Sequence, residues 1–221
     1  MNAIKKMKIN RKNAYTLVEL LVVISVLLLG FSILVINTNS GDGARLSAAQ
    51  RILSGSVKAA RGQAILKSAN TRLIIHNDPA DVDKYRRFVG IVYDEDNDAA
   101  TESWVAANQG TYLPKGIYFD SAVSQSESTG IGASWNAAGN AMQIDYPRLS
   151  GQTGNSGTDY LYYEFNDTGT FSDPNAYLVF RAGRMIPGTG LDFPDAQSGI
   201  ISALIIRRGG SATVVEDPGV F

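Results

Sequence analysis

An apolar run near the N-terminus constrains this chain more than any other feature of its sequence. The run covers 20 residues, from Leu17 to Ile36, about the length that a helix needs to cross a hydrocarbon core roughly 30 Å thick. Five basic residues and no acidic residue precede it, a pattern that keeps the N-terminus of such a span in the cytoplasm. No small-x-small cleavage site follows it, so the run is interpreted as a membrane anchor rather than a removable secretory signal.

The charged residue within this run is Glu19, close to its start. A carboxylate inside a membrane costs roughly 3 kcal/mol on insertion scales, and it is tolerated when an opposite charge pairs with it. The run therefore predicts either that Glu19 pairs with an opposite charge or that Glu19, close to the start of the run, extends to the lipid headgroups without a specific role.

The rest of the chain has the composition of one acidic, β-rich domain. It contains no Cys, which excludes disulfides, thiolate metal sites and cysteine nucleophiles, and its single His76 excludes a site that needs two histidines. Removal of the first 14 residues, with five of the 20 basic side chains, would leave 15 basic and 21 acidic residues, a net charge of −6. This balance argues against a general nucleic-acid binder.

A second helix is predicted from residue 44 to residue 69, after the turn-forming stretch 37–43. Apolar residues recur in it at spacings of three and four and form one stripe, which favours packing against a sheet. The stripe consists of Leu46, Ala49, Leu53, Val57, Ala60 and Ala64. The helix carries basic residues and no acid, so its outer face either contacts acidic neighbours or is simply solvated.

The residues that follow alternate between short β-rich segments and links rich in Gly, Asn and Asp, which is typical of antiparallel sheets. Eight strands are predicted, at 71–76, 86–94, 116–120, 141–146, 160–165, 176–182, 199–208 and 212–216. A long helix followed by strands predicts an α+β fold, with the helix packed on antiparallel β-sheets.

The N-terminal sequence AYTLVELLVVISVLLLG resembles the class III signal of type IV pilins and type II secretion pseudopilins. The resemblance implies a pilin-like fold, cleavage by a prepilin peptidase between Ala14 and Tyr15, and N-methylation of Tyr15. Glu19 then occupies the fifth mature position, where that family carries a glutamate expected to meet the Tyr15 amine of a neighbouring subunit. Ala14 replaces the usual Gly and Tyr15 replaces the usual Phe, so Ala14 remains small and Tyr15 remains aromatic.

Three later segments, at 48–78, 113–120 and 163–171, look like elements of the GspH/FimT group of minor pseudopilins and pilins, whereas the stretch 121–159 has no counterpart there. The resemblance implies a minor pseudopilin of a type II secretion system rather than an enzyme. Its implied location is the bacterial inner membrane, in a single pass, with the N-terminus cytoplasmic and the globular domain periplasmic. Its implied partners are other pseudopilins or pilins, prepilin peptidase, inner-membrane lipid and a secreted substrate.

The expected domain organisation follows from these assignments. It comprises a leader peptide at 1–14, a transmembrane and assembly helix at 15–36, a linker with the amphipathic half of the helix at 37–69, and a periplasmic β-rich domain at 70–221. The alternatives are a minor type IV pilin and a DNA-uptake pilin similar to FimT.

The acidic stretch around residue 95 is a candidate calcium site. Asp94, Asp96 and Asp98 alternate as the first oxygen ligands of a calcium loop do. The remainder of an EF-hand is missing, because Ala99 stands where Gly is needed and Val105 where the bidentate Glu belongs. Related pseudopilins use loop calcium, so Ca²⁺ is retained as a candidate beside a solvated acidic turn, and no other cofactor is expected.

Four arginines near the C-terminus are a candidate DNA contact. They are Arg181, Arg184, Arg207 and Arg208. FimT-like competence pilins bind DNA through a C-terminal basic patch, whereas the negative net charge and nearby acidic residues favour ion pairing within the protein. DNA is therefore not expected as a partner. His76 lacks a G-x-S-x-G element that would suggest a hydrolase and is interpreted as a strand-end residue with a local hydrogen bond.

Overall fold

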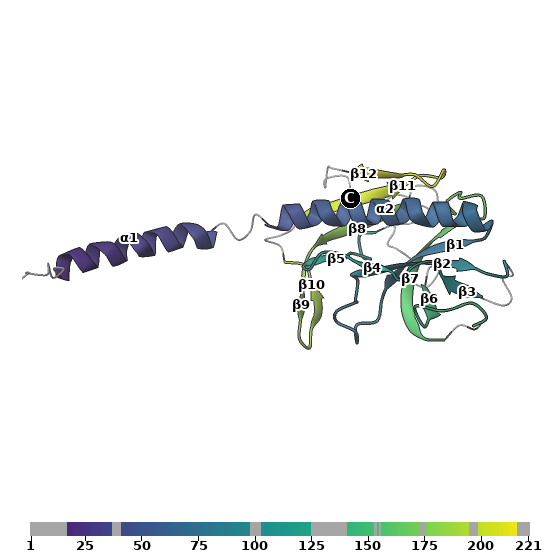
Figure 1. The fold of residues 1–221 in the computed structure, drawn as a ribbon, viewed down its shortest axis with the longest axis horizontal. Coiled ribbons are helices and arrows are strands. Elements are labelled where there is room, and N and C mark those ends of the chain that lie inside the picture. The colour runs from purple at the N-terminus through teal and green to yellow at the C-terminus, as the bar shows by residue number, and fades with distance from the viewer. Residues whose placement is uncertain are drawn as a thin grey trace, which may run out of the picture. The chain divides into compact units, whose positions relative to one another are not determined.

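The computed structural model describes residues 17–36, 41–97, 103–124, 141–152, 154, 156–172, 176–194 and 199–215, and in the first of these ranges it describes the side chains of residues 17–26. The chain divides into two units, Met1–Gly41 and Asp42–Phe221. The second unit is an α+β domain of one helix and antiparallel strands, as the sequence predicts (Figure 1).

Helix α1 spans Leu17–Ile36 and lies in the first unit. Glu19 lies in its first turn, where a negative charge is favourable because the backbone N–H groups there have no partner within the helix. Ser25 donates a hydrogen bond of 2.8 Å to the carbonyl of Leu21, so even a polar side chain here is satisfied by the helix itself. Among the described residues, no helix is long and apolar enough to cross a membrane.

Helix α2 spans Gly41–Lys67 and begins three residues before the predicted start. Its first turn contains Asp42, which pairs with Arg45 at 2.9 Å. It ends two residues earlier than predicted, because Ser68 has a φ of 50° and turns the chain out of the helix. The amide of Ala69 donates to the carbonyl of Ala64 and that of Ser68 to Ile65, which is the hydrogen-bond pattern of a Schellman cap.

The predicted apolar stripe of α2 is confirmed. Its residues from Ala49 to Ala64 are buried completely, and Leu46 packs against them while partly exposed. Arg51 and Lys58 lie on the exposed side of the helix. The stripe faces both sheets of the domain and shares one core with them, so packing of this face fixes α2 on the strands.

Among the described residues, the strands form two antiparallel sheets and one small hairpin. The larger sheet has the order β3-β2-β1-β7-β6, with β4 also paired to β2; the smaller sheet has the order β12-β11-β8-β5, and β9 pairs with β10. The strands are β1 (Thr71–His76), β2 (Phe88–Asp94), β3 (Trp104–Ala106), β4 (Thr111–Tyr112), β5 (Ile117–Phe119), β6 (Ala141–Ile144), β7 (Thr158–Phe165), β8 (Ala176–Ala182), β9 (Arg184–Ile186), β10 (Gly190–Asp192), β11 (Ile201–Ile206) and β12 (Ala212–Val215).

All eight predicted strands are present among the described residues, together with four that were not predicted. Strands β1 and β8 have the predicted bounds, β7 begins two residues earlier than predicted, and the other five are shorter. The unpredicted strands are β3, β4, β9 and β10, each only two or three residues long. A segment of that length has too few residues to show alternation, so its pairing depends on the strand it meets.

Sheet β3-β2-β1-β7-β6 is buried on both faces. Leu73 and Ile75 of β1 join the core formed with α2 and the smaller sheet, whereas Ile74 between them joins a second cluster. That second cluster includes Phe88, Trp104 and further residues of β2, β6 and β7. Successive side chains of a strand point to opposite faces, so the unbroken apolar run Leu73–Ile75 in β1 fits a position with apolar neighbours on both sides.

Candidate functional sites

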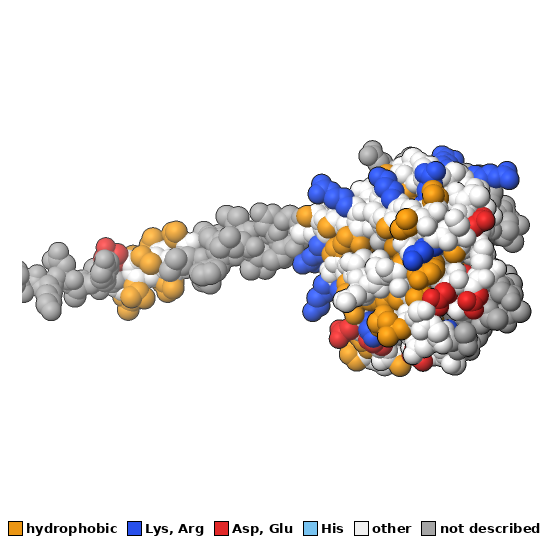
Figure 2. Space-filling model, turned by 45° about the vertical axis from the view of Figure 1, so that its right-hand side comes forward, with side chains coloured by type: hydrophobic (Ala, Val, Ile, Leu, Met, Phe, Trp, Pro, Cys, Tyr) orange, Lys and Arg blue, Asp and Glu red, His pale blue; other side chains and the backbone are white. Residues whose placement is uncertain are grey.

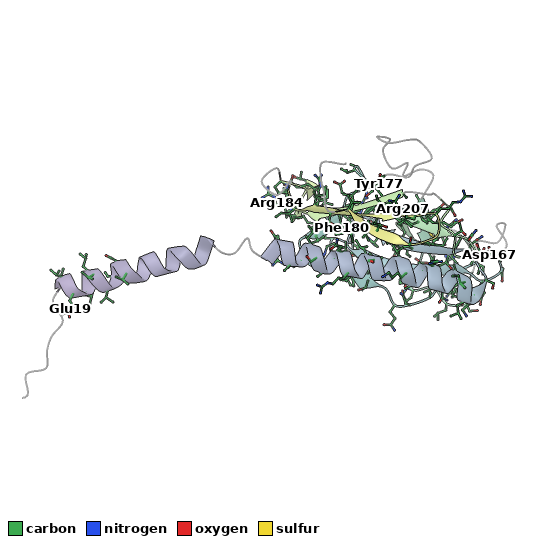
Figure 3. The ribbon with its side chains drawn as sticks, turned by 90° about the horizontal axis from the view of Figure 1, so that it is seen from above. Glu19, Asp167, Tyr177, Phe180, Arg184 and Arg207 are labelled. Atoms are coloured by element: carbon green, nitrogen blue, oxygen red, sulfur yellow. The ribbon has the colours of Figure 1, made fainter. Side chains whose placement is uncertain are left out.

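The processing and assembly residues lie at the start of the chain. Glu19 is exposed in the first turn of α1 and is labelled in Figure 3. Ala14 and Tyr15, the predicted cleavage position, lie outside the described residues. The cleavage and the pairing of Glu19 with a mature N-terminus remain predictions.

The candidate calcium ligands begin at the end of β2. Asp94 is buried, at 4% exposure, and burial raises the pKa of its carboxyl. The backbone N–H groups of Asp96 and Asn97 lower that pKa, so the Asp94 carboxylate accepts hydrogen bonds from the turn that follows it. Asp96 is exposed and Asp98 lies outside the described residues. In the part of the chain that the structure describes, no three acidic or histidine side chains form a group that could hold a metal ion.

Two of the four candidate arginines pair with acidic side chains. Arg181 Nε lies 2.7 Å from Asp120 Oδ2, and the Arg181 guanidinium also lies over the Phe193 ring at 4.0 Å. Arg184 Nε lies 3.0 Å from Asp192 Oδ2 across the β9–β10 hairpin. Both pairings are those expected for arginines that neutralise acids of the same domain.

The four arginines do not form one patch. Arg181 aligns with Ile201, at the start of β11, whereas Arg207 and Arg208 follow the end of that strand. Six residues of extended chain separate the two positions by about 20 Å. Arg184 and Arg207 accordingly lie well apart along the domain (Figure 3). A common DNA contact would have to span this distance and compete with Asp120 and Asp192.

His76 closes β1 in a buried position. The residue is 1% exposed, and its ring meets the edge of Tyr160 with centroids 5.2 Å apart. Its Nδ1 atom has no hydrogen-bond partner among the described residues, so the expected local hydrogen bond is missing at that atom. Burial lowers the pKa of His76 and Lys84 acts in the same direction, while Asp81 and Asp78 act against it. The ring is therefore held neutral as part of the packing.

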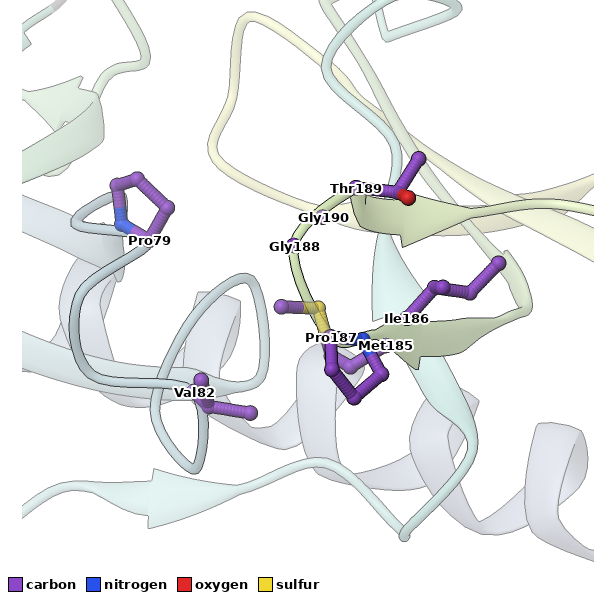
Figure 4. Close-up of a pocket in the computed structure, with 8 residues that line it drawn as sticks. All are labelled: Pro79, Val82, Met185, Ile186, Pro187, Gly188, Thr189 and Gly190. Atoms are coloured by element: carbon purple, nitrogen blue, oxygen red, sulfur yellow. The ribbon is translucent and has the colours of Figure 1, made fainter.

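A cleft of about 450 Å³ opens between the loop after β1 and the β9–β10 hairpin (Figure 4). Pro79 and Val82 form one wall, and residues 185–190 form the other. The lining is apolar except for the hydroxyl of Thr189 and contains no titratable side chain. Such a surface is suited to apolar contact.

A second, shallower groove of about 320 Å³ lies between α2 and β12, and the sequence did not indicate it. It is lined by Gln50, Arg51, Ser54, Gly55, Lys58 and Val214. The sequence contains only the helix side of the groove, where Arg51 and Lys58, seven residues apart, place two cations beside Gly55, a residue without a side chain. Only the tertiary fold brings the edge of β12 beside these two cations.

Comparison with known proteins finds one match. Residues 9–35 match the family described as the prokaryotic N-terminal methylation motif. No curated protein and no solved structure matches the chain. The motif is the prepilin signal of type IV pilin-like proteins, which are structural subunits processed by prepilin peptidase. The chain thus carries a type IV pilin-like prepilin signal, with Glu19 inside it and the β-rich domain behind it.

Proposed function

We propose that this chain is a minor pseudopilin, a structural subunit of a type II secretion pseudopilus. Prepilin peptidase removes residues 1–14, Tyr15 becomes the methylated N-terminus, and the apolar helix anchors the subunit in the bacterial inner membrane. The same helix then packs with those of other subunits, and the β-rich domain meets partner subunits or the secreted substrate in the periplasm. A minor type IV pilin is the alternative in the same structural class.

The observation that carries this proposal is the methylation motif at residues 9–35. It coincides with an apolar run that begins at Leu17, two residues after the predicted cleavage position, and contains Glu19. The globular domain supports a binding role, because its described clefts are an apolar surface and a basic groove. The separation of the C-terminal arginines gives no support to DNA uptake through them.

Processing is tested by co-expressing the chain with a prepilin peptidase and measuring the mass of the intact product. The wild-type chain should lose residues 1–14 and gain one methyl group on Tyr15. Ala14→Arg should remain uncleaved, because a long cation replaces the small residue at the cleavage position. Ala3→Arg adds the same charge earlier in the leader and should be cleaved normally. Removal of the leader from Ala14→Arg at the same bond would refute the assigned site.

Assembly is tested with Glu19→Ala in the processed chain. The variant should enter the membrane fraction as the wild type does. After cross-linking, the amount of partner subunit that co-purifies with it should be at least tenfold lower than with the wild type. Loss of one member of a buried ion pair costs about 3–5 kcal/mol, and each 1.4 kcal/mol is tenfold in affinity. Ser25→Ala, two turns further along α1, is the matched control and should assemble. Normal recovery of partners with Glu19→Ala would contradict the role of the glutamate.

The identity of the recovered partners separates the two structural alternatives. Subunits and substrates of a secretion system support the pseudopilin assignment, and pilus subunits support the minor pilin. Recovery of neither class from a correctly processed and membrane-bound chain would count against both.

A further inference from the structure

The groove between α2 and β12 lies at the edge of the smaller sheet, which leaves part of the helix uncovered. Val214 of β12 lines the groove together with α2 residues, yet it remains 37% exposed. On the helix side, a Cβ atom added to Gly55 would meet nothing within 4 Å. The groove therefore has room for another layer of side chains between a helix and a strand.

The strand beside the groove has a free edge. Among the described residues, β12 pairs with β11 alone, and this pair forms one end of the smaller sheet. The amide of Arg207 donates to the carbonyl of Ser211 at 2.8 Å where the two strands join. Hydrogen-bonded pairs alternate along an antiparallel ladder, so the backbone groups of Thr213 and Val215 face β11 and those of Ala212 and Val214 face outward.

The side chains around the groove are basic. Arg51 and Lys58 are exposed, seven residues and so about 10 Å apart along α2, and neither forms an ion pair among the described residues. The only acid of α2 is Asp42, which pairs with Arg45. Figure 2 shows Lys and Arg side chains over the upper part of the domain, whereas most of the visible Asp and Glu side chains lie lower.

We propose that an extended, acidic segment of a partner protein binds here by adding a strand to β12. Its backbone would pair with the outward groups of Ala212 and Val214, and its acidic side chains would face Arg51 and Lys58. Strand addition supplies affinity through main-chain hydrogen bonds and specificity through alternate side chains, and this groove offers both. The inference depends on the globular unit and is independent of the prepilin signal.

A protein strand fits the groove better than nucleic acid does. The described lining of the groove includes two cations, Arg51 and Lys58, and both lie on its helix side. Nucleic acid needs a broad basic track along its backbone. A free strand edge is a template for another polypeptide.

The experiment measures binding of labelled peptides to the full chain in detergent micelles by fluorescence anisotropy at low salt. Two peptides of about nine residues share an alternating Thr/Val sequence and carry either two Glu or two Lys at the same positions. The acidic peptide should bind at least tenfold more tightly than the basic one, and high salt should reduce the difference. Hydrogen exchange at the amides of Ala212 and Val214 should slow when the acidic peptide is bound.

Three variants locate the site. The double variant Arg51→Glu with Lys58→Glu should reverse the preference between the two peptides. Val214→Pro removes an outward N–H without removing a hydrogen bond to β11, and it should lower the affinity for the acidic peptide at least tenfold. Gly55→Leu fills the groove from the helix side and should lower this affinity by a similar factor. It tests the same site if the proline variant does not fold. Lys115→Glu reverses an exposed charge in the turn before β5 and should bind as the wild type does.

Three results would overturn the proposal. The first is equal binding of the acidic and basic peptides. The second is unchanged affinity in both the charge-reversal variant and Gly55→Leu. The third is tighter binding of a single-stranded oligonucleotide than of the acidic peptide, together with loss of oligonucleotide binding in the charge-reversal variant. That result would assign the groove to nucleic acid.

Discussion

At the scale of single residues, Arg72 and His76 of β1 show two ways in which the domain accommodates a polar side chain away from solvent. Arg72 projects between the rings of Trp104 and Tyr162, 3.9 and 4.0 Å from their centroids, and its Nε lies 2.6 Å from a carboxylate oxygen of Glu164. This cation is satisfied by one acid and two π faces. His76 is the opposite case, because its ring is buried beside Tyr160 without a partner at Nδ1.

The burial of His76 predicts a loss of stability in mild acid. Its folded-state pKa lies below 6.5, so as the pH falls through 6.5 the unfolded chain binds a proton before the folded chain does. The free energy of unfolding should therefore decrease from pH 6.5 downward until the folded-state pKa is reached. Thermal unfolding measured from pH 7.5 to pH 5 should show this decrease in the wild type.

His76→Phe keeps an aromatic ring against Tyr160 and removes the proton site. Its melting temperature should fall less over the same pH range than that of the wild type. Asp94 cannot cause the decrease, because burial raises the pKa of its carboxyl and its protonation in acid favours the folded state; this opposing contribution is present in both proteins and does not affect their comparison. An identical pH profile for His76→Phe and the wild type would exclude His76 as the source.

The residue roles differ in how far the sequence predicted them. The position of Glu19 in the first turn of α1 followed from the apolar run and from the motif. The neutral, buried state of His76 could not be predicted, because it depends on Tyr160, which is 84 positions away in the chain and aligned with it only by the β1–β7 register. The ion pair of Arg181 with Asp120 likewise depends on the pairing of β5 with β8.

At the scale of elements, the packing face of α2 is the one that its sequence predicted. Its apolar residues at spacings of three and four form the buried stripe, and the cap at Ser68 sets its end. Half of the stripe is Ala, so the helix lies close to the sheets, and Leu53 is its largest fully buried side chain. The helix is held mainly by this face, because its other side is exposed and basic.

Leu53→Ala should lower the free energy of unfolding of the globular unit by about 2–5 kcal/mol. The leucine is completely buried, and its removal leaves a cavity between α2 and the strands. Leu66→Ala on the same helix is the matched control, because that side chain is 77% exposed and its loss should change stability by about 0.5 kcal/mol or less. Urea unfolding followed by circular dichroism compares the two, and equal losses would contradict the assigned packing face.

At the scale of the whole molecule, segments that are distant in sequence build the second cluster. Tyr146, after β6, packs its ring against Phe88 of β2 with centroids 5.4 Å apart. Its hydroxyl donates a hydrogen bond to Asn108 in the loop between β3 and β4. Gly90 of β2 lies under this ring, so the absence of a side chain there allows Tyr146 to close the outer face of the sheet.

Gly90→Ala should destabilise the domain by about 1–3 kcal/mol, the usual cost of overpacking. A Cβ atom at this position would lie 2.9 Å from Tyr146 Cζ and 3.2 Å from Ile74 Cγ1. Gly62→Ala is the control, because a Cβ there meets nothing within 4 Å and Ala favours a helix over Gly by about 0.5–1 kcal/mol. Thermal unfolding should therefore shift in opposite directions for the two variants, and a stabilised Gly90→Ala would refute the close packing.

The sequence by itself determined the prepilin signal, the apolar stripe of α2, the eight main strands and the α+β class. These features follow from patterns within one segment, since helical and strand periodicity is set by residues only a few positions apart. The tertiary structure decided the order of the strands, the burial of His76, the distance between Arg181 and Arg207, and the meeting of Arg51 and Lys58 with the edge of β12. These features depend on hydrogen bonds and side-chain packing between segments far apart in the chain, which no local pattern records.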